Sequence, residues 1–231
     1  QPFPTKPPPF AKQGFTEDDV IDFTPELRAM ALEQLDTNNY RLGRIFTPPS
    51  LEGTVTMPGV LGGANWGGAA FDPETGVLYV NARNRPGLIK LAEPEPGDAE
   101  FDYIIEGGGG LEVADGLPVH KPPYNVLTAI DLNRGDHVWQ VTLGDTPQIK
   151  NHPLLQDLDL PLLGGDDGNA GPLLTSAGLL FISAGAKLYA IDKTSGETLW
   201  ETYVRRRGYG NPMTYQTRSG RQFIVIATGQ R

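Results

Sequence analysis

The chain has 231 residues, of which 29 are glycine and 21 are proline, and its formal net charge is −9. This glycine and proline content indicates many turns rather than long helices, while the recurring apolar segments argue against a wholly disordered chain. The negative charge argues against nucleic acid and against an anionic membrane surface as partners. Because the chain has no cysteine, disulfides, thiolate metal sites and covalently attached c-type haem are excluded.

The N-terminal part, residues 1–45, is predicted to be a Pro-rich extended segment followed by one short helix. Residues 1–14 are rich in proline and lack periodicity, so we expect them to be extended, lying over a surface or loose. In residues 24–35, Thr24 can cap a helix and Pro25 suits its first turn. One apolar face of this helix would carry Leu27, Met30, Ala31 and Leu35.

A glycine-rich loop at residues 62–68 carries one amide and one large aromatic side chain, Asn65 and Trp66. A hairpin follows it, with the turn Asp-Pro-Glu-Thr-Gly at residues 72–76. The glycines on both sides let the backbone come close to a flat group. The alternative is a tight turn whose tryptophan is a core residue, since loop tryptophans usually serve packing.

An internal repeat indicates how the rest of the chain is organised. Residues 129–139 read AIDLNRGDHVW and residues 190–200 read AIDKTSGETLW, a period of 61 residues from Asp131 to Asp192. In each copy the aspartate starts and the glycine ends a reversal between two strands. A second pattern adds a small residue, a strand, a turn and another strand; it occurs at 67–80, 171–182 and 211–227. Together the patterns predict four-stranded modules, the blades of a β-propeller.

We therefore expect an all-β fold, with residues 46–231 forming an incomplete propeller of about two and a half blades. The blades would span about 67–143 with an insertion at 83–123, about 170–204, and 211–231, the last truncated. A β-sandwich is the alternative, but it would not need the same tryptophan in successive modules. Because so few blades cannot close a ring, and because the chain starts at Gln1, we expect the later part of a larger protein, or half of a nicked or oligomeric one.

The tryptophans of the repeat, Trp139 and Trp200, are predicted to pack against the neighbouring blade and join two blades together. Trp66 precedes a blade and lies outside the repeat, so this structural role does not extend to it.

At this point the sequence resembles a known family, the glucose-dehydrogenase-like quinoprotein dehydrogenases, which carry pyrroloquinoline quinone (PQQ) in an eight-bladed propeller. The repeated turn is similar to their tryptophan-docking motif. The segment FTEDDVIDFTPELRA at 15–29 is similar to the connection before their C-terminal part. The motifs that follow in the same order are FTPPS at 46–50, LGGANWGG at 61–68, DPETGVLYVN at 72–81, NAGPLLTSAGLLFI at 169–182, NPMTY at 211–215 and GRQFIVIATG at 220–229.

The resemblance implies cofactor-binding roles for Asn65 and Trp66. Asn65 would donate its amide to the quinone or carboxylate oxygens of PQQ, and Trp66 would help to wall the pocket. The turn Thr228–Gly229–Gln230 would approach the same channel. Nothing in this chain matches the family's catalytic aspartate or its divalent cation ligands, so we expect no catalytic and no metal-binding residue here, with Ca or Mg held elsewhere in the complete protein.

The resemblance also implies a reaction and partners. The complete protein would oxidise a hydroxyl group of a sugar or alcohol in the periplasm and pass electrons to a separate acceptor, a quinone or a cytochrome. The remaining blades would come from missing sequence or another chain, and the chain alone would be inactive. The alternative function is a non-catalytic propeller scaffold of the outer-membrane-assembly type, which gives Asn65 and Trp66 no evident role.

Other candidate site residues are interpreted as structural. His120, His137 and His152 lack metal-ligand spacing and are expected at the surface or in turns. The group Asp166, Asp167 and Asn169 is expected to be a solvated turn rather than a calcium loop. The acidic stretch at 93–100 is expected to be solvated, and the basic triplet at 205–207 is a poor signal for nucleic acid.

Overall fold

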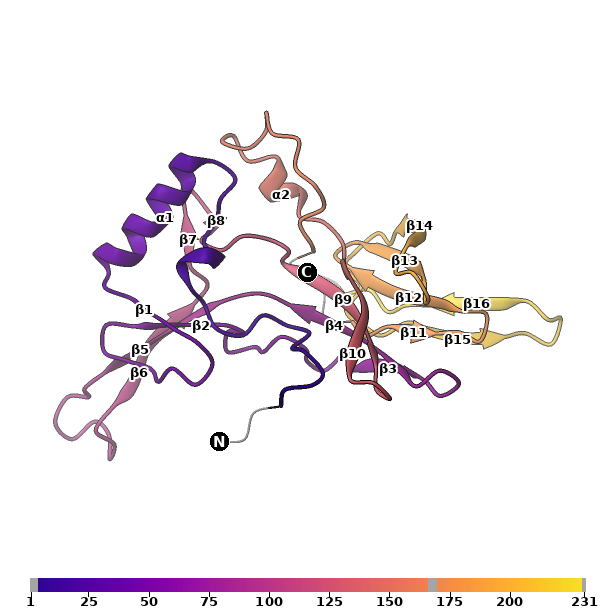
Figure 1. Cartoon of the computed structure of the whole chain (residues 1–231), viewed down its shortest axis with the longest axis horizontal. Coiled ribbons are helices and arrows are strands. Elements are labelled where there is room, and N and C mark those ends of the chain that lie inside the picture. The colour runs from indigo at the N-terminus through magenta and orange to yellow at the C-terminus, as the bar shows by residue number, and fades with distance from the viewer. Residues whose placement is uncertain (1–3, 166–169, 230–231) are drawn as a thin grey trace.

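The computed structural model describes residues 4–165 and 170–229 of the chain (Figure 1). Most of its regular structure is strand, and no helix in this described part is long and apolar enough to cross a bilayer. The helices are η1 (Glu17–Asp19), α1 (Pro25–Thr37) and α2 (Pro147–Lys150). The strands are β1 (Arg41–Leu42), β2 (Thr54–Thr56), β3 (Ala69–Asp72), β4 (Val77–Arg83), β5 (Gly87–Ala92), β6 (Ile104–Gly109), β7 (Glu112–Val113), β8 (Leu117–Pro118), β9 (Asn125–Asp131), β10 (Asp136–Thr142), β11 (Leu173–Leu174), β12 (Leu179–Ala184), β13 (Lys187–Asp192), β14 (Thr198–Tyr203), β15 (Met213–Gln216) and β16 (Gln222–Val225).

Two four-stranded antiparallel sheets follow one another along the chain, as expected for propeller blades. The first has the order β10-β9-β4-β3, with β5 to β8 inserted between β4 and β9. The second has the order β11-β12-β13-β14. A two-stranded hairpin of β15 and β16 comes third. We call these modules the first blade, the second blade and the terminal hairpin.

The repeated turn forms for the reasons that its residue types predict. Asp131 Oδ1 accepts hydrogen bonds from the backbone nitrogens of Asn133 and Arg134, at 2.9 and 3.1 Å. Asp192 Oδ1 does the same in the second blade, accepting from Thr194 N and Ser195 N at 2.8 Å each. Each turn closes on a glycine with positive φ, at 70° and 77°, which residues with a Cβ rarely adopt (Gly135 and Gly196). The turn chemistry therefore fixes where the third strand of each blade reverses into the fourth.

Trp139 joins the first blade to the second. Its indole Nε1 donates a hydrogen bond to the Lys193 carbonyl at 3.1 Å, and its ring lies directly against Gly196, where a Cβ would meet the ring at 2.9 Å. The Tyr79 ring also packs against Trp139, with ring centroids 5.8 Å apart. These contacts border an apolar cluster shared by both blades, made of Tyr79, Leu127, Ala129, Leu143, Leu180, Ile182, Ala184, Tyr189 and Ile191. The predicted role of Trp139 is confirmed.

Trp200 occupies the same motif position in the second blade but is 49% exposed. Its predicted packing against a following blade is not met within the described residues. The physical reason is that Trp139 packs against the turn between the third and fourth strands of the next blade, whereas the terminal hairpin has two strands and lacks that turn. Other large apolar side chains around this end of the chain are also exposed: Leu199, Tyr203, Tyr209, Met213, Tyr215 and Val225.

A buried ion pair also crosses between the two blades. Lys193 Nζ lies 2.8 Å from Asp72 Oδ2, and the Asp72 side chain is 4% exposed. The hydrogen bond from Lys193, assisted by one from Thr75, holds the pKa of Asp72 below its usual value. The same bond raises the pKa of Lys193. The pair therefore adds stability while both groups are charged.

Asp72→Asn is expected to lower the free energy of unfolding at neutral pH. Because the pKa of Asp72 is depressed on folding, its contribution is present above about pH 3.8, the pKa of a free aspartate, and is lost as the pH falls further. The difference in unfolding free energy between the wild type and Asp72→Asn should become smaller as the pH falls below about 3.8. Denaturant titrations at several pH values measure it. Asp136→Asn, which removes the exposed pair with Lys6, is the control and should change little. A difference that does not vary with pH would contradict the prediction.

The predicted N-terminal helix is α1. Thr24 caps it, with Oγ1 accepting from Leu27 N at 3.2 Å, and Pro25 occupies the first position. Leu27, Ala31 and Leu35 are buried, but Met30 is 45% exposed, so its placement on the apolar face was wrong. Adjacent residues lie about 100° apart around a helix, which turns Met30 away from Ala31, at the centre of the buried face.

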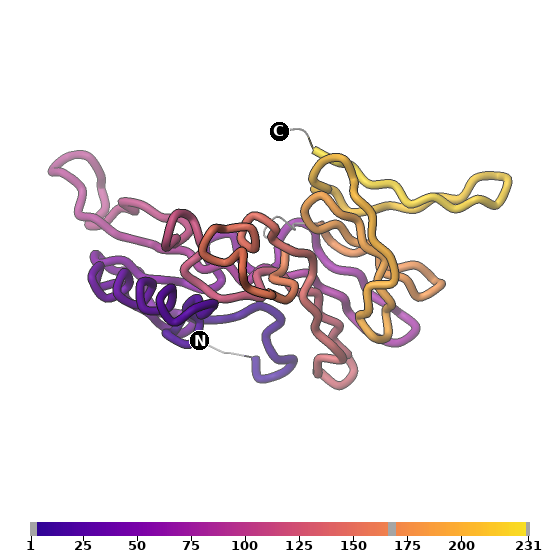
Figure 2. Tube along the Cα trace, turned by 90° about the horizontal axis from the view of Figure 1, so that it is seen from above, coloured from indigo at the N-terminus to yellow at the C-terminus, as the bar shows by residue number. Residues whose placement is uncertain are grey.

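The insertion between β4 and β9 builds a further sheet with the N-terminal part. β5 pairs with β6, and β2 adds to β5 while β1 adds to β2. A core beside this sheet combines α1, the β7–β8 hairpin and the segment around α2; its members include Phe15, Leu27, Ala31, Leu35, Leu111, Val113, Leu117, Ile149 and Leu155. Figure 2 shows α1 and the β5–β6 hairpin at one end of the elongated chain and the terminal hairpin at the other.

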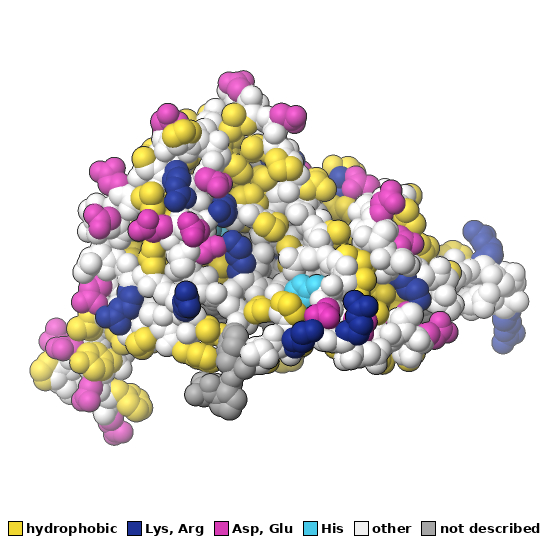
Figure 3. Space-filling view, viewed as in Figure 1, with side chains coloured by type: hydrophobic (Ala, Val, Ile, Leu, Met, Phe, Trp, Pro, Cys, Tyr) yellow, Lys and Arg dark blue, Asp and Glu magenta, His cyan; other side chains and the backbone are white. Residues whose placement is uncertain are grey.

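Residues before η1 run along the outer strand of the first blade. Gln140 donates to the Phe10 carbonyl at 3.2 Å, and His137 Nε2 lies 2.9 Å from the Pro8 carbonyl. Ala11 packs with Ala82 and Val126 in a small apolar cluster. This segment therefore covers one face of the blade. On the side of the molecule shown in Figure 3, acidic and basic side chains are interspersed.

Candidate cofactor-binding site

The loop before β3 is braced by the side chain of Asn65. Asn65 Nδ2 donates to the Leu61 carbonyl at 3.0 Å, Oδ1 accepts from Trp66 N at 2.9 Å, and the Asn65 carbonyl accepts from Gly68 N at 3.0 Å. Gly62 and Gly68 have φ values of 72° and 67°, which allow the chain to reverse twice within seven residues. Asn65 thus shapes the loop that presents the next residue.

Trp66 is 97% exposed at the tip of this loop. Its ring has no aromatic contact among the described residues, in contrast to Trp139, which packs between the blades. An indole held out by a braced loop is available to cover a flat ligand. The alternative that Trp66 is a core residue is therefore excluded for this structure.

The loop is anchored where the inner strands of the three modules begin. Asn211, before β15, donates from Nδ2 to the Gly67 carbonyl at 2.8 Å and accepts from Gly171 N, before β11, at 2.7 Å. A Cβ at Gly171 would collide with the Gly67 carbonyl oxygen. Residues 67, 171 and 211, which we call the hub clasp, therefore bring the first blade, the second blade and the terminal hairpin together beside Trp66.

A second anchor ties the loop to β4. Arg83 N donates to the Gly63 carbonyl at 2.9 Å, and Asn81 Nδ2 donates to the Ala170 carbonyl at 3.2 Å. The end of β4 therefore lies at the same end of the blade as the Asn65–Trp66 loop. The insertion, which starts there, rises from that end as well.

Sequence reasoning found the loop but missed the partner that holds it. The small residue that starts each hairpin pattern was recognised only as a repeat marker, and Asn211 in NPMTY was given no role. The signal was present, because Gly67, Gly171 and Asn211 occupy the same place in the three copies. Their contact depends on the arrangement of blades around a common centre, which periodicity alone does not fix.

Other predicted site residues lie as follows. Thr228 bridges to Gly208, and Gly229 N donates to the Arg207 carbonyl at 3.0 Å. Gln230 and the group Asp166, Asp167 and Asn169 lie outside the described residues. In the described ranges no group of three or more His, Asp and Glu side chains is placed to hold a metal ion.

His120 is buried, at 5% exposure, so the expectation of a surface or turn histidine was wrong. It follows the β7–β8 hairpin, bridges to Val20 and packs edge-on to Tyr124, with ring centroids 5.0 Å apart. Burial, with a smaller effect of the nearby Arg85 and Lys12 charges, lowers the pKa of His120 to about 3. The ring is therefore neutral at physiological pH.

The residues at the hub fit a planar, carboxylate-bearing quinone. The Asn65 amide carries two N–H groups, and Leu61 engages one of them, so one donor remains for a ligand. Trp66 provides an exposed flat face. Gly171, where a Cβ would meet the Gly67 carbonyl oxygen, lets the two backbone segments beside this loop approach each other closely. A remaining donor and an exposed flat face are features that orient a flat cofactor.

Known proteins share both the sequence and the fold of this chain. Residues 1–224 match the family described as the PQQ β-propeller domain of glucose, ethanol and alcohol dehydrogenases. The glycerol dehydrogenase large subunit of Gluconobacter oxydans is 30% identical over 99% of this chain and 34% of its own length. The quinoprotein glucose dehydrogenase of Escherichia coli is 31% identical over 80% of this chain and 26% of its length. The quinate/shikimate dehydrogenase (quinone) of Acinetobacter baylyi is 28% identical over 99% and 30%.

Solved structures agree in fold. A quinohemoprotein alcohol dehydrogenase of Pseudomonas putida HK5 superposes on 77% of this chain and 24% of its own, with a TM-score of 0.54 at 19% identity. That of Comamonas testosteroni gives 0.52 at 22% identity, over the same shares of the two chains. This chain spans 26–34% of the length of the three relatives named above. The expected partial propeller is thus confirmed, and the chain belongs to the PQQ-dependent glucose, ethanol and alcohol dehydrogenase β-propeller family.

Proposed function

We propose that this chain is part of a PQQ-dependent dehydrogenase that oxidises a hydroxyl group of a sugar or alcohol, and that it contributes one side of the cofactor cradle. The observation that carries this proposal is the braced Asn65–Trp66 loop at the hub clasp, whose indole is almost fully exposed. Family membership supports the same reaction class.

Asn65 and Trp66 have separate tasks in this proposal. PQQ supplies, when bound, a quinone that accepts the electrons removed from the alcohol carbon. Asn65 would donate its remaining amide N–H to an oxygen of the cofactor, and the exposed face of Trp66 would cover the cofactor and exclude water. The hub clasp keeps both residues in place, because the Gly67 carbonyl that follows them is held by Asn211.

The proton-accepting base and the divalent cation, Ca or Mg, are assigned to other parts of the complete protein. Within the described residues no acidic cluster suits a metal ion, and Asp72, a carboxylate at the blade interface, is engaged by Lys193. We therefore expect this chain alone to be inactive. The exposed apolar side chains around Trp200 offer a surface against which further blades would pack.

The electron acceptor and compartment follow the family in this proposal. Among similar proteins, the quinate/shikimate dehydrogenase of Acinetobacter baylyi is named for a quinone and the lupanine 17-hydroxylase of a Pseudomonas species for cytochrome c. We assign this protein a separate acceptor of one of these two kinds and a periplasmic location. The proposal includes no nucleic acid partner, and it gives no residue of this chain a part in electron transfer to the acceptor.

The cofactor role is tested by substituting the two loop residues in the full-length protein. Asn65→Ala should weaken PQQ binding about tenfold, since one hydrogen bond to a charged or polarised oxygen is lost. Trp66→Ala should weaken it by tenfold or more, because the stacked face is lost. Binding is measured by quenching of tryptophan fluorescence, and turnover by dye reduction with sugars and alcohols.

Trp200→Phe is the control, because Trp200 lies outside the loop and the change keeps an aromatic ring. Its PQQ affinity should equal that of the wild type. If Asn65→Ala and Trp66→Ala both left PQQ affinity and turnover unchanged, the assigned site would be wrong. If the wild type bound no PQQ and reduced no dye, the non-catalytic scaffold would be the better description.

A further inference from the structure

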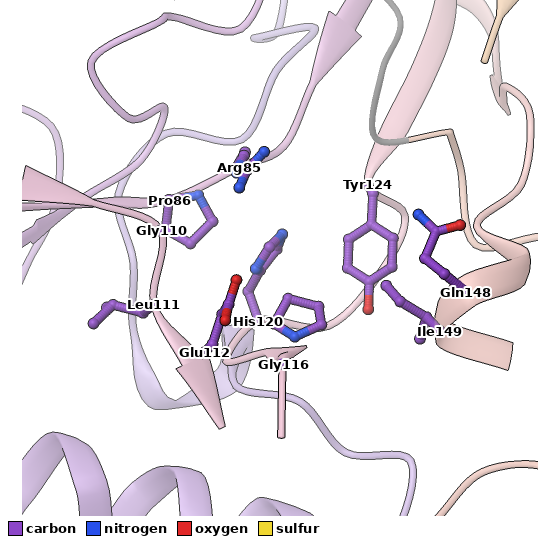
Figure 4. Close-up of a pocket in the computed structure, with 11 residues that line it drawn as sticks. Arg85, Pro86, Gly110, Leu111, Glu112, Gly116, His120, Tyr124, Gln148 and Ile149 are labelled. Atoms are coloured by element: carbon purple, nitrogen blue, oxygen red, sulfur yellow. The ribbon is translucent and has the colours of Figure 1, made fainter. Parts of the chain in front are cut away.

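A cavity of about 110 Å³ lies between the insertion and α2 (Figure 4). Its floor is formed by buried side chains, among them Leu111, His120 and Ile149. Exposed polar side chains stand at its mouth: Arg85, Glu112 and Gln148. In Figure 4 the His120 ring points into the space between Arg85, Glu112 and Tyr124. One water needs roughly 10–15 Å³ of such space, so the cavity is large enough for a molecule of several heavy atoms.

One side chain that lines this cavity, His120, has a buried polar atom, Nδ1. This atom has no hydrogen-bond partner within the described residues. The ring is neutral, and a hydrogen bond with the Asn84 backbone opposes the fall in its pKa. Because Nδ1 has no partner, we assign that bond to the other ring nitrogen, Nε2. A bond to a carbonyl requires that nitrogen to carry the proton, which leaves Nδ1 with the lone pair. His120 therefore offers a hydrogen-bond acceptor to whatever occupies the cavity.

The charges around the cavity favour a neutral occupant. The groups that act on His120 are Arg85 and Lys12, which disfavour its protonation, and Asp19, which favours it; Glu112 stands across the mouth. The cavity therefore has a neutral hydrogen-bond acceptor on His120 and, at its mouth, the positive Arg85 and the negative Glu112. This set suits a neutral molecule that both donates and accepts hydrogen bonds, rather than an ion of either sign. A compound with neighbouring hydroxyl groups has this property.

We propose that the cavity between the insertion and α2 binds a small neutral polyol, one of whose hydroxyl groups donates to His120 Nδ1. A second hydroxyl donates to the Glu112 carboxylate at the mouth, and a third accepts from the Gln148 amide on the far side of Tyr124. No residue of the 62–68 loop lines this cavity, and its occupancy does not require PQQ, so the site can be tested independently of the proposed dehydrogenase activity.

The test is a titration of the full-length protein with glycerol, followed by the ¹⁵N shifts of the His120 imidazole. A saturable shift is expected. The affinity for glycerol should not change between pH 5 and 8, because the His120 ring stays neutral over that range. His120→Gln keeps a donor toward Asn84 but removes the Nδ1 acceptor, and should weaken glycerol binding at least tenfold when followed by calorimetry. Gln148→Leu, at the exposed mouth, should weaken it about threefold.

Gln156→Leu is the matched control, since Gln156 is also exposed and near α2 but does not line the cavity. It should bind glycerol as the wild type does. Acetate or methylammonium binding at the same site more tightly than glycerol would overturn the assignment of a neutral ligand. The absence of saturation up to about 0.1 M glycerol in the wild type would overturn the site itself, and equal affinity in wild type, His120→Gln and Gln148→Leu would do so as well.

Discussion

Trp139→Ala is expected to lower the free energy of unfolding by about 2–3 kcal/mol. Truncating a core tryptophan typically costs about 3–5 kcal/mol, and Trp139 is only partly buried, so we expect a cost at or just below the bottom of that range. The loss has three physical sources: the ring that covers Gly196, the hydrogen bond to the Lys193 carbonyl and the contact with Tyr79. Denaturant titrations followed by circular dichroism measure it.

Trp200→Ala supplies the matched control, because Trp200 has the same motif position and the same side chain but is half exposed. In this chain it should cost less than about 1 kcal/mol. In the full-length protein, where we propose that a further blade packs on this surface, the cost should rise toward that of Trp139→Ala. Equal costs of the two substitutions in this chain would contradict the docking assignment, as would a negligible cost of Trp139→Ala.

The blades were predictable because their turns are encoded locally. An aspartate that accepts two backbone N–H groups and a glycine with positive φ need only a few consecutive residues, and these recur in Asp131 and Asp192. The tryptophan that follows each of these turns, Trp139 or Trp200, could be predicted to be a packing residue because it recurs at the same position of the motif. Whether a given tryptophan is covered depends on the neighbouring module, which explains why the prediction succeeded for Trp139 and not for Trp200.

The insertion was less predictable because its contacts are far apart in sequence. β2 pairs with β5 more than thirty residues later, and His120 is buried by packing with the N-terminal part through Val20. No local sequence pattern predicts such long-range strand pairings, and the sequence around an isolated histidine does not indicate whether its side chain is buried. The cavity beside His120 arises from these same long-range contacts, so sequence reasoning could not reach it.

The sequence indicated which loop forms the candidate site, but not the hydrogen bonds that shape this loop. Glycines around Asn65 and Trp66 indicated a close approach, and the order of motifs indicated the family. The internal bonds of Asn65 to Leu61 and Trp66 could not be read from the sequence, because an amide in a glycine-rich loop can equally face solvent. The structure therefore adds a second task to Asn65, since it fixes the loop as well as offering a donor.

Gly171→Ala is expected to destabilise the chain by about 2–3 kcal/mol, the upper part of the range for overpacking. A Cβ at this position would collide with the Gly67 carbonyl oxygen, and both groups are backbone, so neither can turn aside as a flexible side chain could. The hub clasp would open, because Asn211 binds Gly67 and Gly171 together. For a protein of this size the midpoint of thermal unfolding should fall by roughly 5–10 °C.

The same substitution should also weaken PQQ binding in the full-length protein by about tenfold, because displacing Gly67 moves Trp66, its neighbour in the chain. Gly107→Ala is the control: Gly107 lies on β6, and a Cβ there would meet nothing within 4 Å, so the thermal midpoint and PQQ affinity should both stay at the wild-type values. A Gly171→Ala protein that kept its thermal midpoint would show that the clasp is not a rigid contact. One that lost stability but bound PQQ as tightly as the wild type would separate the clasp from the cofactor site, and Asn65 and Trp66 would then have to be held by the Gly63–Arg83 anchor alone.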